Sequence, residues 1–360
     1  MSVSVVGSIG KCIDQPVLVS KFGATVPKLL IAGSLAKCGI ETYKAPKKEK
    51  KKTFIKTFCV LAGTVSGALL ATKQTLNLNS VKDTLKSQKE VVSGILTKNK
   101  NISAQARQLL QKSGSGKILT PGEIKTLSDS LPKNKTKDIL NAIIPPTQCV
   151  KAKDIVKELG SLSYLGLLPV VGGIAGGIAG NAMTEKDWKK KVPNQIKEGS
   201  FQYFANIFLC NIGAAAALGG LELFARKGHA WATTNMARVI GMGAGIMATG
   251  VIGGSAIANW IGKKLINPIF ETKEEKAIRK AKEKAGIKES IYSERKPELA
   301  DMGLHVDDFA TIGVLSGVKF IEPALPILYS LSGYRSGIGY RNSDESSNEK
   351  IKGHHHHPHH

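Results

Sequence analysis

An uncharged stretch at residues 159–184, 26 residues long, limits this chain more than any other part of its sequence. An α-helix rises about 1.5 Å per residue and about 20 apolar residues span a bilayer, so this stretch is long enough to cross a membrane. Within it, Gly173 precedes Gly177 by four residues, and Gly176 precedes Gly180 by four. This spacing gives one helix face a strip of bare backbone that a second helix can approach closely.

Two further uncharged runs follow, at residues 199–221 and 239–262. The later run repeats the glycine spacing, so it offers the first run a neighbour for packing. A soluble bundle is the alternative, but a soluble helix has one polar face, and these runs show none over about six turns. We therefore predict an all-α, multi-pass membrane protein with a tightly packed three-helix block at residues 159–262. Its helix-packing residues are Gly173, Gly176, Gly177, Gly180, Gly241, Gly245, Gly250 and Gly254.

The N-terminal part divides into three segments. Residues 1–53 read as a basic arm that lies on the membrane as a short helix, and residues 54–72 as the first transmembrane helix. The uncharged core of the latter has only 16 residues, so a buried or interfacial helix is the alternative. Residues 73–158 are polar and predict amphipathic helices, one of which starts at Thr120 with a capping box to Glu123.

The C-terminal part also divides into three segments. Residues 263–308 form a charged helical segment. Residues 309–334 are apolar, but Lys319 and Glu322 interrupt them, so they predict a further membrane helix or a re-entrant segment. Residues 335–360 predict a disordered His-rich tail, which is either a purification tag or a native sequence that captures metal weakly.

The charge of the chain predicts a lipid partner. The net charge is +23, from 44 Lys and 7 Arg against 28 acidic residues. Lysine-rich surfaces suit anionic lipid headgroups, whereas nucleic-acid readers rely on arginine, so a nucleic-acid partner is not expected. The loop at residues 185–198 and the segment at 263–308 carry twelve basic residues near span ends, against six at the opposite ends. The positive-inside rule therefore places residues 185–198 and 263–308 in the cytoplasm.

Catalytic and metal-binding signatures are weak. The five cysteines form no CxxC pair, and GSGK at residues 114–117 lacks the strand and the hydroxyl residue of a phosphate loop. His305, Asp307 and Asp308 lie close in sequence, but a metal site needs three or four converging groups. We therefore predict no enzyme activity, no cofactor and no metal site.

Four amides are predicted to lie at similar depth in the three-helix block: Asn181, Gln202, Asn206 and Asn259. They either hydrogen-bond between helices or line a polar vestibule, with Lys319 and Glu322 as an intramembrane pair. Two functions remain open. The first is a non-enzymatic membrane scaffold or homo-oligomer packed through its glycine faces, within or between copies. The alternative is a transporter or pore with an amide-lined vestibule.

Overall fold

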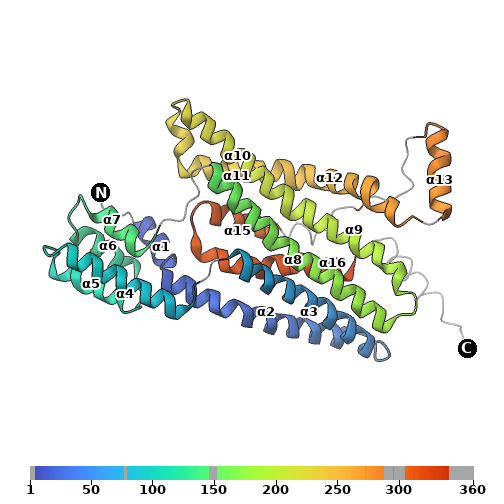
Figure 1. The fold of residues 1–360 in the computed structure, drawn as a ribbon, viewed down its shortest axis with the longest axis horizontal. Helices are drawn as coiled ribbons and strands as arrows, with labels where there is room; N and C mark the ends of the chain where they lie inside the picture. The colour runs from blue at the N-terminus through green and yellow to red at the C-terminus, as the bar shows by residue number, and fades with distance from the viewer. Residues whose placement is uncertain are drawn as a thin grey trace, which may run out of the picture.

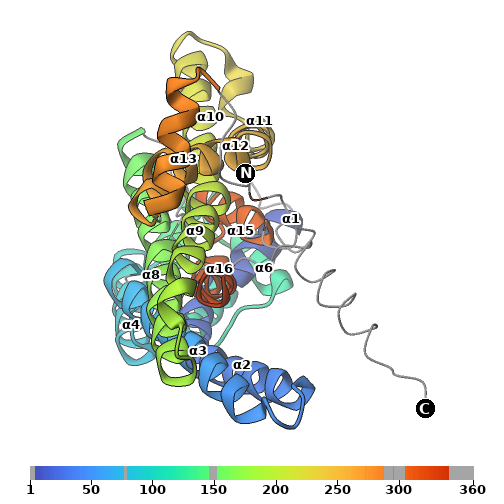
Figure 2. The same cartoon turned by 90° about the vertical axis from the view of Figure 1, so that its right-hand side faces the viewer.

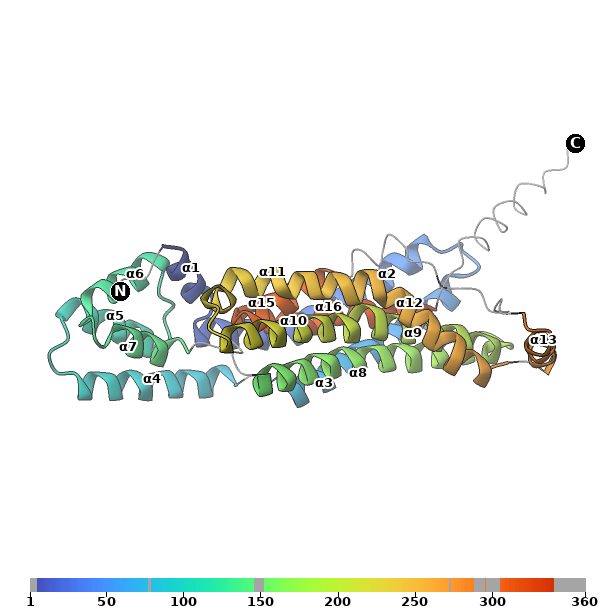
Figure 3. The same ribbon diagram turned by 90° about the horizontal axis from the view of Figure 1, so that it is seen from above.

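Every element in the described part of this computed structural model is helical (Figure 1). The structure describes residues 5–76, 79–145, 152–271, 273–287, 295 and 305–339. Most of the predicted His-rich tail, residues 340–360, lies outside the described residues, as does much of the segment at 288–304. The helices form a long bundle with a separate group of short helices at one end (Figure 3).

Five helices of the described chain are long and apolar enough to cross a membrane. Three of them are single helices: α2 (Pro16–Lys44), α3 (Lys50–Thr75) and α8 (Ala152–Thr184). The fourth is the run Trp188–Arg226, which contains α9 (Val192–Tyr203) and α10 (Leu209–Arg226). The fifth is the run Met236–Ile269, which contains α12 (Gly253–Ile261) and all but the first residue of α11 (Asn235–Ile246). The predicted all-helical architecture is confirmed for the described residues, and the five candidate spans are consistent with a multi-pass membrane protein.

The N-terminal arm differs from the prediction. Most of residues 1–53 belongs to α2, a helix of 29 residues that qualifies as a span by length and composition. Residues 54–72, predicted as the first span, lie in α3 and follow α2. The sequence obscured α2 because lysines are dispersed along it. Lys21, Lys28 and Lys37 are spaced so that an 18-residue window of α2 holds at most two charged residues and stays apolar on average.

Four short helices at residues 81–143 form a head domain with its own apolar core. They are α4 (Val81–Lys98), α5 (Ala104–Gly114), α6 (Pro121–Ser130) and α7 (Thr136–Ile143). Ser80, Ser103 and Thr120 cap the first three, and Thr120 and Glu123 form the predicted capping box. The buried core includes Leu110, Leu119, Ile124, Leu127 and Ile143.

The head is fixed to the start of the bundle by a paired hydrogen bond. The Gln15 side chain donates to the Leu119 carbonyl over 2.7 Å and accepts from the Leu119 N–H over 2.8 Å. Gln15 lies in the two-residue connection between α1 (Val5–Ile13) and α2, and α1 packs on α6. One buried amide therefore connects the head to the first candidate span.

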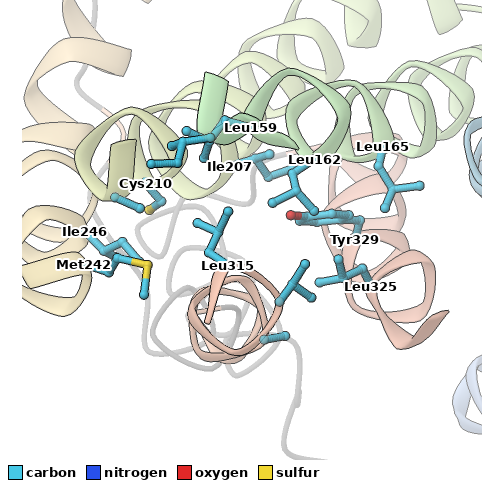
Figure 4. Close-up of a cluster of buried hydrophobic side chains, with 14 of the residues drawn as sticks. Leu159, Leu162, Leu165, Ile207, Cys210, Met242, Ile246, Leu315, Leu325 and Tyr329 are labelled. Carbon is cyan, nitrogen blue, oxygen red and sulfur yellow. The ribbon is translucent and has the colours of Figure 1, made fainter. Parts of the chain in front are cut away.

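Two short helices fill the centre of the bundle where one further span or a re-entrant segment was predicted. They are α15 (Val306–Leu315) and α16 (Leu325–Ile338), joined by a turn and a 3-10 segment. Gly317, with a φ of 92°, ends α15, and Pro323 and Pro326 prevent one helix from continuing through the turn. In the end-on view, α16 lies among α3, α8 and α9 (Figure 2). Leu315, Leu325 and Tyr329 of this hairpin are fully buried in the main core (Figure 4).

Lysine-rich segments meet at the end of the bundle away from the head. Glu185, just after α8, pairs with Lys56, with Lys191 at 2.7 Å and with Lys52 at 3.4 Å. Helix α13 (Lys273–Lys284) lies at the same end (Figure 3). Burial raises the pKa of Glu185, but hydrogen bonds from Lys191 and Lys56 outweigh it and lower the pKa to about 2.

The Glu185 cluster predicts an acid-sensitive stability. An unfolded glutamate has a pKa of about 4.3, so the folded form gains stability from Glu185 above that pH and loses it as the pH falls toward 2. The contribution is at most about 3 kcal/mol. We expect Glu185→Gln to lower the melting temperature in detergent at pH 7 and to flatten its decline between pH 4.5 and 2.

Glu49→Gln is the matched control, because Glu49 faces one of the same lysines, Lys52, with a side chain 52% exposed. It should leave both the melting temperature and its pH dependence nearly unchanged. Equal effects of the two substitutions would contradict the assignment of this pH dependence to Glu185.

Candidate functional site

The predicted glycines lie at three different helix interfaces. Gly173 and Gly177 face the backbone of α16 at Gly333 and Gly337, while Gly176 and Gly180 face α3 at Cys59 and Lys56. The later set faces the other long run instead: Gly241 lies toward Leu221, Gly245 toward Gly213, Gly250 toward Cys210 and Gly254 toward Ala205. The sequence suggested that the two glycine sets pack on each other. In the structure the first set instead meets α3 and α16, and the later set meets the run Trp188–Arg226.

The backbones of α8 and α3 also meet at further glycines. A Cβ added at Gly172 would clash with the carbonyl oxygen of Gly63, and one added at Gly67 would clash with that of Leu168. Sequence analysis did not select Gly63, Gly67, Gly333 or Gly337. The available signal was their four-residue spacing, in GTVSG at residues 63–67 and GYRSG at 333–337, which matches the spacing within α8.

A buried ion pair forms the polar centre of the bundle. The Glu198 side chain, on α9, is 1% exposed and accepts two hydrogen bonds from Arg295, each of 2.9 Å. Arg335 of α16 has its Nε 3.8 Å from the same carboxylate. The Arg295 guanidinium also lies over the Phe201 ring, 3.9 Å from its centroid. Arg335 of α16 and the distant Arg295 thus converge on one carboxylate of α9.

Three of the four predicted amides extend this network. Gln202 donates to Glu198 over 2.7 Å, and Asn206 donates to Gln202 over 2.8 Å. Asn259 holds Arg295 in place, because its side chain donates to the Arg295 carbonyl and accepts from the Arg295 N–H, each over 3.0 Å. The fourth amide, Asn181, is buried near the end of α8, and the structure shows no hydrogen bond from it to this network.

Two π-helical turns shape the surroundings of the network. One spans Phe204–Phe208 between α9 and α10, and the other spans Met247–Ile252 between α11 and α12. They touch, and the Thr249 hydroxyl donates to the Leu209 carbonyl over 2.6 Å across the interface. π-Helical turns inside α-helices often mark functional positions, because they leave carbonyls for other partners.

The predicted Lys319–Glu322 pair forms in the 3-10 segment between α15 and α16. It lies near the head, since the Phe320 N–H donates to Asp14, which precedes α2. The Glu322 side chain is buried, but that of Lys319 is 40% exposed. The pair therefore sits at the end of the bundle rather than at its centre.

Local sequence patterns do not predict the buried Glu198–Arg295 ion pair, for a physical reason. Glu198 and Arg295 are 97 residues apart, so no local spacing relates them. Two signals existed. Glu198 lies four residues before Gln202 on the same helix face, and Arg295 is one of only seven arginines among 51 basic residues. Arginine suits a bidentate contact with a buried carboxylate better than lysine does.

The arrangement of this site favours a structural role for its residues over a catalytic one. The Glu198 carboxylate accepts from an arginine and an amide, and Arg295 is held at both its side chain and its backbone. Comparison of the chain with protein-family models, curated proteins and solved structures finds no match. Conclusions about function therefore rest on this geometry.

The glycine interface predicts a position-dependent response to added methyl groups. In Gly176→Ala, the new Cβ would clash with the Cys59 carbonyl, so α3 and α8 must separate. We expect a loss of about 1–3 kcal/mol, seen as a lower melting temperature in detergent. Gly220→Ala is the matched control, because nothing lies within 4 Å of its new Cβ, and it should be neutral or stabilising by up to about 1 kcal/mol. Equal destabilisation by both would argue against contact at Gly176.

The ion pair predicts a large loss on removal of one partner. Glu198→Gln leaves Arg295 without its buried counter-charge, which costs about 3–5 kcal/mol of stability. Adding Arg295→Met should recover part of that loss, and thermal unfolding of the four proteins of the double-mutant cycle measures the coupling.

Glu222→Gln, in the same helical run, is the control. Its partner Arg226 has a side chain that is 70% exposed, so we expect a change of at most about 1 kcal/mol. Additive effects at Glu198 and Arg295 would show that the two residues are not coupled.

Proposed function

We propose that this protein is a non-enzymatic membrane scaffold, whose helical bundle anchors a folded head on one side of the bilayer. The observation that carries this proposal is the closed polar network at Glu198. Its amides hydrogen-bond to the ion pair or to each other, which is the arrangement expected of groups that join helices. A solute path would need polar groups that face an opening.

The outer surface of the bundle supports a lipid environment. Large apolar side chains are exposed along the candidate spans, among them Leu29, Ile31 and Leu35 of α2, Phe54 and Phe58 of α3, and Leu223 and Phe224 of α10. In water such side chains would form an adhesive surface, whereas lipid tails solvate them.

The glycine contacts bear on oligomerisation. The eight predicted glycines face other elements of the same chain, so in this proposal they join helices within one copy. Homo-oligomers, if they form, use another surface. Glycine-rich packing then serves to hold five spans and the α15–α16 hairpin together in the absence of a hydrophobic driving force between helices in lipid.

The ends of the bundle suggest an orientation. The lysines around Glu185 and those of α13 lie at one end, and the positive-inside rule assigns that end to the cytoplasm, against anionic lipid. The head lies at the other end (Figure 3). Residues 81–144 carry twelve basic and five acidic residues, so the head offers a basic surface outside the cytoplasm.

A transporter or pore is the second candidate, and the paired π-helical turns favour it. Buried ionisable groups within a membrane bundle commonly mark ion or solute paths. Here Asn206 lies in the first of the two π-helical turns and is connected to Glu198 through Gln202. In this alternative, helical register shifts at these turns would open a path past the amides.

Flux measurements distinguish the two candidates. For the scaffold we expect purified protein in proteoliposomes to pass K⁺, Cl⁻ and glycerol no faster than empty vesicles do. Flux above that background, lost in both Asn206→Ala and Glu322→Gln, would establish the transporter instead. Each variant is first tested by gel filtration, so that loss of flux through unfolding is recognised.

The same vesicles test the orientation. Single cysteines introduced at Ser115 in the head and at Lys190 near Glu185, in a cysteine-free chain, should react with an impermeant maleimide from opposite sides. Labelling of both from one side would overturn the proposed topology, and with it the anchoring of the head across the bilayer.

A further inference from the structure

Three potential metal ligands from two distant parts of the chain converge beside the main core. Cys210 lies in the first turn of α10, which follows the π-helical turn, whereas His305 precedes α15 and Asp308 lies in the first turn of α15. One ligand atom from each residue lies within 4.8 Å of the other two. Cys210 is fully buried among Ile207, Met242 and Ile246 (Figure 4). This cluster lies outside the Glu198 network.

The position of the thiol is fixed on both sides. The Cys210 Sγ donates to the Ala205 carbonyl over 3.4 Å, a carbonyl of the π-helical segment. On its other side the sulfur lies against Gly250, where an added Cβ would overlap it. Only glycine leaves room there, so the facing run is shaped to hold this sulfur. The thiol therefore occupies a defined place rather than filling a gap.

The acidic residues of α15 need a counter-charge. The residues Asp307 and Asp308 are 3% and 7% exposed, and both lie close enough to the Cys210 thiol to interact with it electrostatically. His305 Nδ1 is 2.6 Å from Asp308 Oδ2, whereas Asp307 Oδ1 is buried without a hydrogen-bond partner in the described part of the chain. Two carboxylates on one helical turn, one of them unsatisfied, are costly in an apolar bundle.

We propose that Cys210, His305 and Asp308 bind a divalent transition metal of the zinc class. A thiolate and an imidazole select zinc-like ions over Mg²⁺ and Ca²⁺, which prefer oxygen ligands alone. The thiolate and the Asp308 carboxylate carry two negative charges, so they neutralise the ion within the bundle. Asp307, the neighbour of Asp308 in the same helical turn, adds a further buried carboxyl group whose Oδ1 has no hydrogen-bond partner among the described residues.

The distances are compatible with binding after small side-chain rotations. Ligand atoms around tetrahedral zinc lie roughly 3.5 Å apart, since each is about 2.0–2.3 Å from the metal. On binding, the Cys210 S–H bond breaks, the proton leaves to solvent, and a metal–sulfur bond forms. The His305–Asp308 hydrogen bond opens so that both side chains face the ion. The metal then links α15 to the run Trp188–Arg226.

Cobalt titration of the full chain tests this site, because a cobalt–thiolate bond has a charge-transfer absorption in the near ultraviolet. The six histidines of residues 354–360 are replaced by alanine, since they would bind metal themselves. We expect one Co²⁺ per chain with this absorption, displaced by Zn²⁺. Cys210→Ala should abolish the absorption, and His305→Ala and Asp308→Asn should each weaken affinity by at least ~10-fold.

Cys38→Ala is the matched control, because Cys38 is also a buried thiol, in a candidate span, and should leave the absorption unchanged. If Cys210→Ala fails to fold, Asp308→Asn still tests the proposal: zinc should raise the melting temperature of the parent protein and not that of Asp308→Asn. Binding without the thiolate absorption, absorption that survives in Cys210→Ala, or an equal zinc effect in Asp308→Asn would each overturn it.

Discussion

The close contact of helix backbones in the centre of the bundle is the constraint on which the rest of the structure depends. In lipid, apolar helices gain nothing from leaving the surrounding chains, so they associate through van der Waals contact and hydrogen bonds. Gly172 and Gly176 let α8 meet α3, and Gly173 and Gly177 let it meet α16. Side chains at these positions would hold the helices apart, and the short α15–α16 hairpin would lose its place between them.

Close packing in turn determines where charges can lie. Arg335 reaches Glu198 from α16, next to Gly333 and Gly337, so the ion pair depends on the same interface that the glycines create. Arg295 completes the pair from a distant segment and is held there by Asn259. Glu198 and Arg295 are thus each matched by a buried partner of opposite charge, which is the condition for keeping a carboxylate in an apolar bundle. In the proposed metal site, the bound ion supplies the opposite charge for the aspartates of α15.

The two ends of the bundle have different characters. At one end, Glu185 gathers lysines from α3 and from the loop after α8, which would otherwise repel each other. At the other end, the head folds around its own core and is joined to the bundle through Gln15. A bundle with a lysine-rich end and a folded head at the opposite end suits a protein that is anchored in one orientation.

Local patterns in the sequence determined the helices, their caps and the presence of several apolar runs. The capping box at Thr120 and the runs at residues 199–221 and 239–262 were visible because helix periodicity and hydropathy depend on neighbouring residues. The dispersed lysines of α2 concealed one candidate span. Only the tertiary structure decided which helix each glycine meets, that Arg295 pairs with Glu198, and that Cys210 lies beside His305 and Asp308. These residues are distant in sequence, so their contacts follow from how the helices pack and not from any local pattern.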